Sequence, residues 1–126
     1  MEINLPDVVA EVTAAFMRYQ KAVDANDFET MNALFWESPQ TVRLGPNGTL
    51  TGHAAISAFR RNRAGRVTQR RLQNTVITTF GRDFAATNTE STKPGQPGIS
   101  RQSQCWVRTP DGWRIASAHV SDQPGT

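Results

Sequence analysis

Apolar residues in the first part of the chain recur at the spacing of an amphipathic helix. Six of them fall three or four positions apart, which puts them on one stripe of a helix: Leu5, Val9, Val12, Phe16, Tyr19 and Val23. Pro6 is compatible with the first turn of that helix, where its missing N–H breaks no hydrogen bond. We therefore predict a long N-terminal helix with one face in the core.

Three further elements are expected in the next forty or so positions. The spacing of Asn26 and Glu29 resembles a capping box, which predicts a short second helix that ends before Pro39. Residues 41–45 read as a short strand that leads into a turn at 46–48. A third helix is expected over 52–63.

After residue 71 the pattern changes to the two-residue period of strands. Residues 72–80 are rich in Thr and Val, and a Gly-Arg-Asp turn separates them from a second predicted strand over 84–91. Two Pro-Gly pairs predict a loop at 93–98. Residues 101–108 and 113–121 flank a Pro-Asp-Gly turn, which predicts a β-hairpin.

The last hairpin is expected to have one face that is apolar near the turn and polar at the far end. If Thr109 pairs with Trp113, then Trp113 shares a face with His119 and, on the neighbouring strand, with Ser103. A register slipped by one residue would instead put Trp106 on the face of Trp113. The first register would fit a conical cavity with a packed base and a polar mouth.

This order of elements predicts an α+β fold, with helices gathered on one face of a curved antiparallel sheet. The chain of 126 residues is long enough for one core, so we expect a single domain over 1–126. No apolar run approaches the roughly 20 residues of a membrane helix. The N-terminus does not resemble a signal peptide, and the chain has one cysteine. We therefore expect a cytoplasmic protein with no membrane partner.

The net charge of +3 is unevenly distributed along the sequence. No Asp or Glu lies between Ser38 and Arg82, whereas arginines are frequent there, at positions 43, 60, 61, 63, 66, 70, 71 and 82. Because no aromatic residues are interleaved with them, we do not expect nucleic acid as a partner. The cluster is either a solvated surface or a means of steering a small anionic substrate, with Arg71 as a candidate substrate-binding residue.

Tyr19 and Arg43 are the two candidate catalytic residues. Tyr19 is the only tyrosine, and it lies on the buried stripe of the first helix. Its hydroxyl either bonds to a backbone carbonyl in the core or carries a proton at the floor of a cavity. Arg43 alternates with Val42 and Leu44, so its side chain points away from theirs. It either faces solvent or lies on the concave face, where it would bind a ligand carboxylate.

His119 is the other group suited to chemistry near neutral pH, unless it is simply bonded to a neighbouring hydroxyl. With it we group Ser103, Arg101 and Gln104 of the same hairpin as candidate substrate-binding residues. Two histidines and no paired carboxylates give no metal site, and no Gly-rich phosphate loop or nucleophile motif is present. We expect no cofactor.

Several stretches of the chain resemble one superfamily. The residues 52–59, with Gly112-Trp-Arg-Ile115 and His119-Val-Ser121, resemble SnoaL-like members of the nuclear-transport-factor-2 superfamily, which have a cystatin-like cone fold. More narrowly, the residues 34–43, 75–84 and 101–108 look like the small AtzH/HpxZ-type proteins of cyanuric-acid and oxalurate catabolism. The similarity covers nearly the whole chain.

This resemblance implies a curved sheet wrapped around the long first helix, a pocket in the cone and usually a homodimer. It also implies a functional link to amidase-signature hydrolases. A tyrosine of the first helix and an arginine of the first strand are the suspected catalytic pair, and Tyr19 and Arg43 stand at the matching positions. Two departures from the pattern, the 46–49 loop and Asn74, leave the substrate open.

The leading hypothesis is a small, cofactor-independent enzyme of nitrogen catabolism. It would be a decarboxylating amidohydrolase that acts on an N-carboxylated urea or a related amide acid. The alternative, from another class, is a non-catalytic accessory or ligand-binding protein of the same fold that partners an amidase. Fold alone does not separate the two, because the cone carries many functions.

Overall fold

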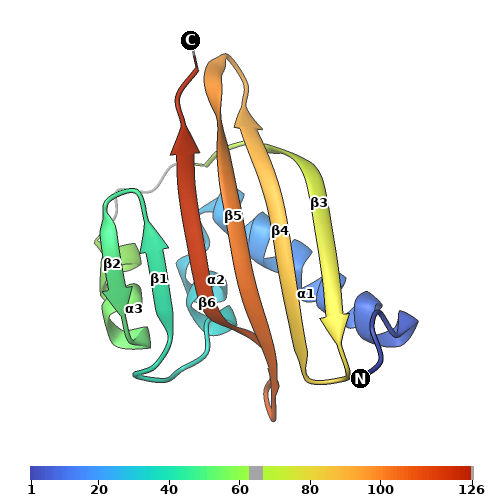
Figure 1. Cartoon of the computed structure of the whole chain (residues 1–126). Coiled ribbons are helices and arrows are strands. Elements are labelled where there is room, and N and C mark those ends of the chain that lie inside the picture. The colour runs from blue at the N-terminus through green and yellow to red at the C-terminus, as the bar shows by residue number, and fades with distance from the viewer. Residues whose placement is uncertain (63–66, 126) are drawn as a thin grey trace.

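Three helices lie against one face of a six-stranded sheet (Figure 1). The structure is a computed structural model and describes residues 1–62 and 67–125. The helices are α1 (Pro6–Ala25), α2 (Phe28–Leu34) and α3 (His53–Arg61). The strands are β1 (Val42–Gly45), β2 (Gly48–Thr51), β3 (Arg71–Phe80), β4 (Phe84–Lys93), β5 (Gln96–Thr109) and β6 (Gly112–Gln123).

The order of strands across the curved sheet is β2-β1-β6-β5-β4-β3. Neighbouring strands are antiparallel except β1 and β6, which are parallel. The predicted α+β class is therefore confirmed, with a mixed rather than a purely antiparallel sheet. The strand β2 was not predicted: Gly45 pairs with Gly48, so the expected turn is the tip of a small hairpin.

The junction between the first two helices differs by one residue from the predicted capping box. Asn26 ends α1 with a left-handed backbone conformation, φ 52° and ψ 42°, which asparagine tolerates better than most residues. Asp27 is the N-cap of α2, and its carboxylate accepts a hydrogen bond from the Thr30 backbone N–H at 3.2 Å. Asn26 is therefore the C-cap of α1, and the adjacent Asp27 is the N-cap of α2.

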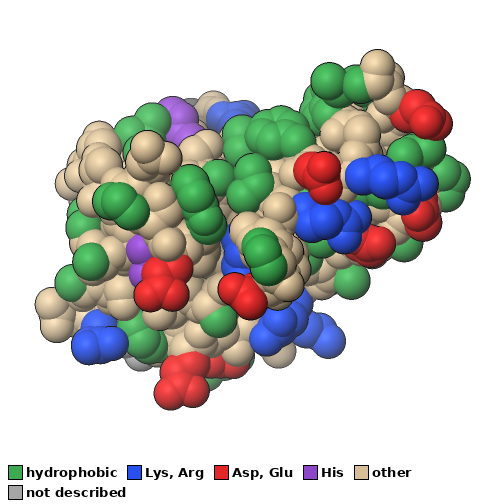
Figure 2. Space-filling model, turned by 90° about the horizontal axis from the view of Figure 1, so that it is seen from below, with side chains coloured by type: hydrophobic (Ala, Val, Ile, Leu, Met, Phe, Trp, Pro, Cys, Tyr) green, Lys and Arg blue, Asp and Glu red, His purple; other side chains and the backbone are tan. Residues whose placement is uncertain are grey.

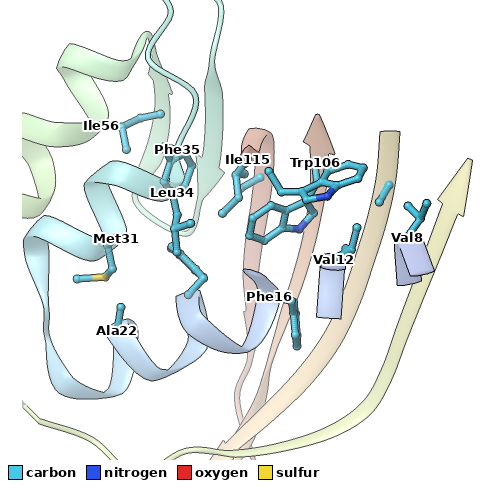
Figure 3. Packing of buried hydrophobic residues seen from close by; sticks show 14 residues of the cluster. Val8, Val12, Phe16, Ala22, Met31, Leu34, Phe35, Ile56, Trp106 and Ile115 are labelled. Carbon is cyan, nitrogen blue, oxygen red and sulfur yellow. The ribbon is translucent and has the colours of Figure 1, made fainter. Parts of the chain in front are cut away.

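The hydrophobic core lies between the helices and the sheet (Figure 3). From α1 it takes Val8, Val12 and Phe16, and Val12 lies beside Trp106. Other fully buried members come from α2, α3 and β6: Leu34, Ile56 and Ile115. The predicted stripe of α1 is confirmed at positions 12, 16 and 19. None of the helices in the described residues is long and apolar enough to span a membrane.

The predicted loop at 93–98 is wrong, because the strands continue almost to its centre. Lys93 pairs with Gln96, which leaves a two-residue turn at Pro94 and Gly95. Gly95 has φ +72°, a conformation that favours glycine. The third helix ends at Arg61, and the last predicted position, residue 63, lies outside the described residues, as does position 66 of the arginine cluster.

The register of the last hairpin is wrong near the turn and right at the far end. Thr109 pairs with Gly112, so the turn has two residues and Trp106 comes opposite Ile115. The register then shifts, and Ser103 pairs with His119 as predicted. Such a β-bulge changes which face later side chains occupy. Trp106, Trp113 and Ile115 are buried on the helix side, whereas His119 is exposed.

Charged pairs gather at the lower end of the molecule, where α1 begins. Arg82 lies 2.9 Å from Asp7, and Arg108 lies 2.7 Å from Glu11. Glu11 also accepts a hydrogen bond from the indole N–H of Trp113 at 3.0 Å. Figure 2, a view from below, shows acidic and basic side chains side by side on this surface. These contacts tie the first turns of α1 to the sheet.

Candidate functional site

One row of side chains crosses the concave face of the sheet, strand by strand. Residues paired on neighbouring strands have side chains on the same face. Arg43 of β1 pairs with Ala118 of β6, Ala118 pairs with Gln104 of β5, and Gln104 pairs with Thr87 of β4. Ala118, Gln104 and Thr87 are buried on the helix side. Arg43 and Gln104 therefore lie on either side of a residue with only a methyl group.

Hydrogen bonds fix which end of the Gln104 amide faces the interior. The indole N–H of Trp106 can only donate, and it donates to Thr87 Oγ1 at 3.0 Å. Thr87 Oγ1 then donates to Gln104 Oε1 at 3.1 Å. The Gln104 amide oxygen thus already accepts one hydrogen bond, whereas its NH₂ group makes none within the described residues and can donate to a ligand. The buried chain therefore makes Gln104 a hydrogen-bond donor.

Arg43 lies between the sheet and α3. Its guanidinium carbon is 5.3 Å from the centre of the Phe59 ring, and Val42 and Leu44 line a pocket on the opposite face. Gly45 makes room for it, because a Cβ at that position would lie 2.7 Å from Nη1 of Arg43. The predicted alternation is confirmed, and Arg43 is on the concave side.

Tyr19 projects from α1 into the same interior and is 3% exposed. Its ring packs edge-on against Phe35, with 5.8 Å between ring centres. Its hydroxyl accepts a hydrogen bond from Nη2 of Arg60. The first alternative for Tyr19, a hydrogen bond from the phenol to a backbone carbonyl in the core, is therefore not observed. The hydrogen-bond partner of the hydroxyl is the Arg60 cation.

Arg60 is the residue of this site that the sequence analysis missed. It was grouped with an arginine cluster that was expected either to be solvated or to steer a substrate, yet it reaches Tyr19 and the ring of Phe35. A signal was present in the sequence, because Arg60 follows the buried Ile56 by four positions. Residues four apart lie on one face of a helix.

The other predicted substrate-binding residues lie elsewhere. Ser103 and His119 line a pocket on the outer face of the sheet, where Ser103 donates to Asn88 Oδ1 at 2.6 Å. Arg101 forms an ion pair with Glu90 at 2.9 Å. Arg71 is exposed at the start of the edge strand β3. The structure brings only Gln104 of this group to the concave side with Tyr19 and Arg43. Ser103 faces outward because it alternates with the buried Gln104 and Trp106 along β5, and the bulge in β6 turns His119 outward.

The concave face thus carries a basic and donor-rich set of groups. Arg43 has no acceptor atoms in its side chain, and Gln104 presents its NH₂ group, so both suit a carboxylate. Tyr19 adds a hydroxyl that can give up a proton. Among residues 1–62 and 67–125, no group of three or more His, Cys, Asp or Glu side chains is placed to hold a metal ion.

The fold is that of the cone-shaped, nuclear-transport-factor-2-like domains. A nuclear-transport-factor-2-like superfamily protein from Salmonella enterica serovar Typhimurium is 27% identical, with a TM-score of 0.71 over 95% of this chain and 93% of that one. The chain itself belongs to the AtzH-like family, whose profile matches residues 1–125.

Two solved structures are much more similar. A protein of unknown function from the DUF3225 family of Pectobacterium atrosepticum is 49% identical, with a TM-score of 0.92 over 96% of this chain and 94% of that one. A cystatin-like fold protein from Burkholderia xenovorans is 48% identical, with a TM-score of 0.93 over 100% of this chain and 99% of that one. No curated protein matches the chain.

Proposed function

We propose that this protein is a small, cofactor-independent enzyme that removes the carboxylate from an N-carboxylated urea or a related amide acid. The observation that carries the proposal is the arrangement of Tyr19, Arg43 and Gln104 on the concave side of the sheet. Membership in the AtzH-like family supports the proposal, because resemblance to that family is what implies a decarboxylating amidohydrolase.

The proposed reaction is a proton-coupled decarboxylation. Arg43 and the Gln104 amide bind and orient the anionic substrate. The bond between nitrogen and the carboxylate carbon breaks, its electron pair stays on nitrogen, and carbon dioxide leaves. Tyr19 donates its phenolic proton to that nitrogen and then recovers a proton from water. The sum is one proton consumed and one carbon dioxide released for each carboxylate removed.

The test is carbon dioxide release from a panel of freshly generated N-carboxyureas. Tyr19→Phe and Arg43→Ala are each expected to lower kcat/KM by about 100-fold or more, the usual cost of losing one group of this kind. Arg18→Ala is the matched control, because Arg18 is exposed on the same helix as Tyr19. Folded variants that keep full activity would contradict the assignment of the site.

The accessory-protein alternative is favoured by a different observation. The outer face of the sheet is not covered by any described helix (Figure 1). Leu44, Val76 and Phe84 each leave more than a third of their surface exposed there. If no compound of the panel is turned over faster than in buffer, co-purification with an amidase-signature hydrolase would test this second function.

The same face is where we propose that two copies of the chain form a homodimer. Phe84→Glu is expected to convert a dimer to a monomer in analytical ultracentrifugation. Val67→Glu, at a residue that is 78% exposed and outside the sheet, is the control. The full proposal includes a cytoplasmic location and a link to an amidase that uses the product.

A further inference from the structure

Arg60 has an unusual set of partners for a shielded guanidinium. Its Nη2 donates to the Tyr19 hydroxyl, and its Nη1 donates to Met31 Sδ at 2.9 Å. Its Nε is buried and has no hydrogen-bond partner in the described part of the chain. No carboxylate within residues 1–62 or 67–125 forms an ion pair with it.

Two aromatic rings hold this guanidinium in place. Its central carbon lies 5.6 Å from the centre of the Tyr19 ring and 5.3 Å from that of Phe35. Cations over ring faces are attracted by the ring quadrupole, but thioether sulfur is a weak acceptor. A cation that lacks a carboxylate partner and leaves one N–H unused adds little to folding compared with an apolar side chain of similar size. Arg60 is therefore hard to explain as a structural residue alone.

We propose that Arg60 is a positioning residue that fixes the direction of the Tyr19 hydroxyl. A guanidinium only donates hydrogen bonds, so the phenolic oxygen in this pair must accept. Its own O–H is then free to donate to a ligand on the concave side. The same positive charge stabilises the phenolate that remains once the proton has been given away.

This inference rests on the proposed function for its catalytic meaning, but not for its structural test. In the proposed decarboxylation the phenolic proton goes to nitrogen, and the phenolate oxygen stays beside Nη2 of Arg60 until water returns a proton. Arg60 touches neither the nitrogen nor the leaving carboxylate in this scheme. Its effect should therefore appear in kcat rather than in KM.

The single tyrosine of the chain allows a direct test of the contact. In Raman spectra, the intensity ratio of the tyrosine Fermi doublet reports whether the phenolic oxygen accepts or donates a hydrogen bond. Without substrate, we expect an acceptor ratio in the wild type, a clear shift toward the donor ratio in Arg60→Met and none in Arg61→Met. Arg61 is the matched control, because it is exposed and lies over Phe28 instead.

Activity gives the second readout. Arg60→Met is expected to lower kcat by about 100-fold with little change in KM, the usual cost of removing one donor that stabilises developing charge. Its thermal stability should stay close to that of the wild type. Arg60→Lys keeps a charge and a donor and should recover part of the lost kcat.

Two results would overturn the proposal. One is a Raman doublet in Arg60→Met that matches the wild type, since Tyr19 would then not depend on Arg60. The other is a folded Arg60→Met variant with the changed doublet and an undiminished kcat. That result would show that Arg60 does not assist turnover, while the proposed function itself would stand. If the wild type turns over no compound, the proposed function fails instead, and the doublet alone decides whether Arg60 sets the hydroxyl.

Discussion

Arg43 and Gln104 lie in one row of the concave face, with Ala118 between them. Their strands, β1 and β5, are the two neighbours of β6 in the sheet. The methyl group of Ala118 leaves the two donor side chains separated by the smallest side chain after glycine. In the proposed function, a carboxylate binds to both donors.

Enlarging the Ala118 side chain should impair both turnover and stability. Ala118→Val is expected to lower kcat/KM by at least about tenfold, because its extra methyl groups would occupy the space between the two donors. The free energy of unfolding should fall by about 1–3 kcal/mol, as for other overpacked sites. Carbon dioxide release and urea denaturation measure the two effects. Ala118→Ser, which is nearly isosteric, should retain most of the activity.

Gln104→Glu tests the donor role of the amide. The carboxylate still accepts the Thr87 hydrogen bond, but it replaces the NH₂ donor by an acceptor with a negative charge. We expect KM for an anionic substrate to rise by about tenfold or more, because like charges repel. Gln40→Glu, at an exposed position, controls for the change in net charge. Equal KM values in the two variants would contradict a donor role.

Gly45→Ala should displace Arg43 without damaging the fold. The added Cβ would lie 2.7 Å from Nη1 of Arg43, at the flexible end of a long side chain. The guanidinium is therefore expected to move, and kcat/KM to fall by roughly tenfold through misplacement of the cation. Thermal unfolding should remain near that of the wild type. A Gly45→Ala variant with full activity would mean that the position of Arg43 is not critical.

The pH dependence of stability should depend on Glu11. The hydrogen bond from the Trp113 indole, and next the Arg108 guanidinium, hold the pKa of its carboxyl below the ordinary value of 4.5. A carboxyl with a lowered pKa in the folded state stabilises the fold above its unfolded pKa, and this contribution is lost as the pH falls through the folded value. Wild type should therefore be more stable than Glu11→Gln at pH 7, with the difference shrinking below about pH 4.5.

Urea denaturation midpoints from pH 7 to pH 3 would measure this difference. Glu37→Gln removes an exposed carboxylate elsewhere and serves as the matched control. A gap between wild type and Glu11→Gln that stays constant over this range would show that the carboxylate charge is not involved.

Local patterns predicted most elements of this fold. The spacing of Val12, Phe16 and Tyr19 gave the buried stripe of α1, because a helix repeats every 3.6 residues regardless of its surroundings. The alternation around Arg43 likewise predicted that its side chain lies opposite those of Val42 and Leu44, although it did not show which face of the sheet that was. Both features depend only on nearest neighbours along one element.

The face of His119 could not be predicted in this manner. Its side depends on the bulge between the residue pairs of Trp106 with Ile115 and Cys105 with Ser117. No glycine or proline lies in the segment that contains the extra residue, so the sequence carries no local signal for it. One unpaired residue of β6 moved His119 to the outer face, away from Tyr19, whereas Ser103 faces outward because it alternates with the buried Gln104 and Trp106 along β5.

Arg60 shows a different limit. Its position on the buried side of α3 was available from helical spacing, but its partner Tyr19 lies on another helix. The sequence assigned no separate role to Arg60 within the arginine cluster, whereas the fold gives each arginine described there its own environment. Arg70, for example, forms an ion pair with Asp24 at 2.6 Å.

The parallel pairing of β1 with β6 has a consequence for how the protein matures. Arg43 lies on the first strand of the sheet, yet the strand that positions it, β6, is the last of the six to be synthesised. Until β6 is added, β1 and its small hairpin have no place in the sheet. The proposed activity should therefore appear only once β6 has joined the sheet, and chains that stop short of β6 would carry Tyr19 and Arg43 without holding them together.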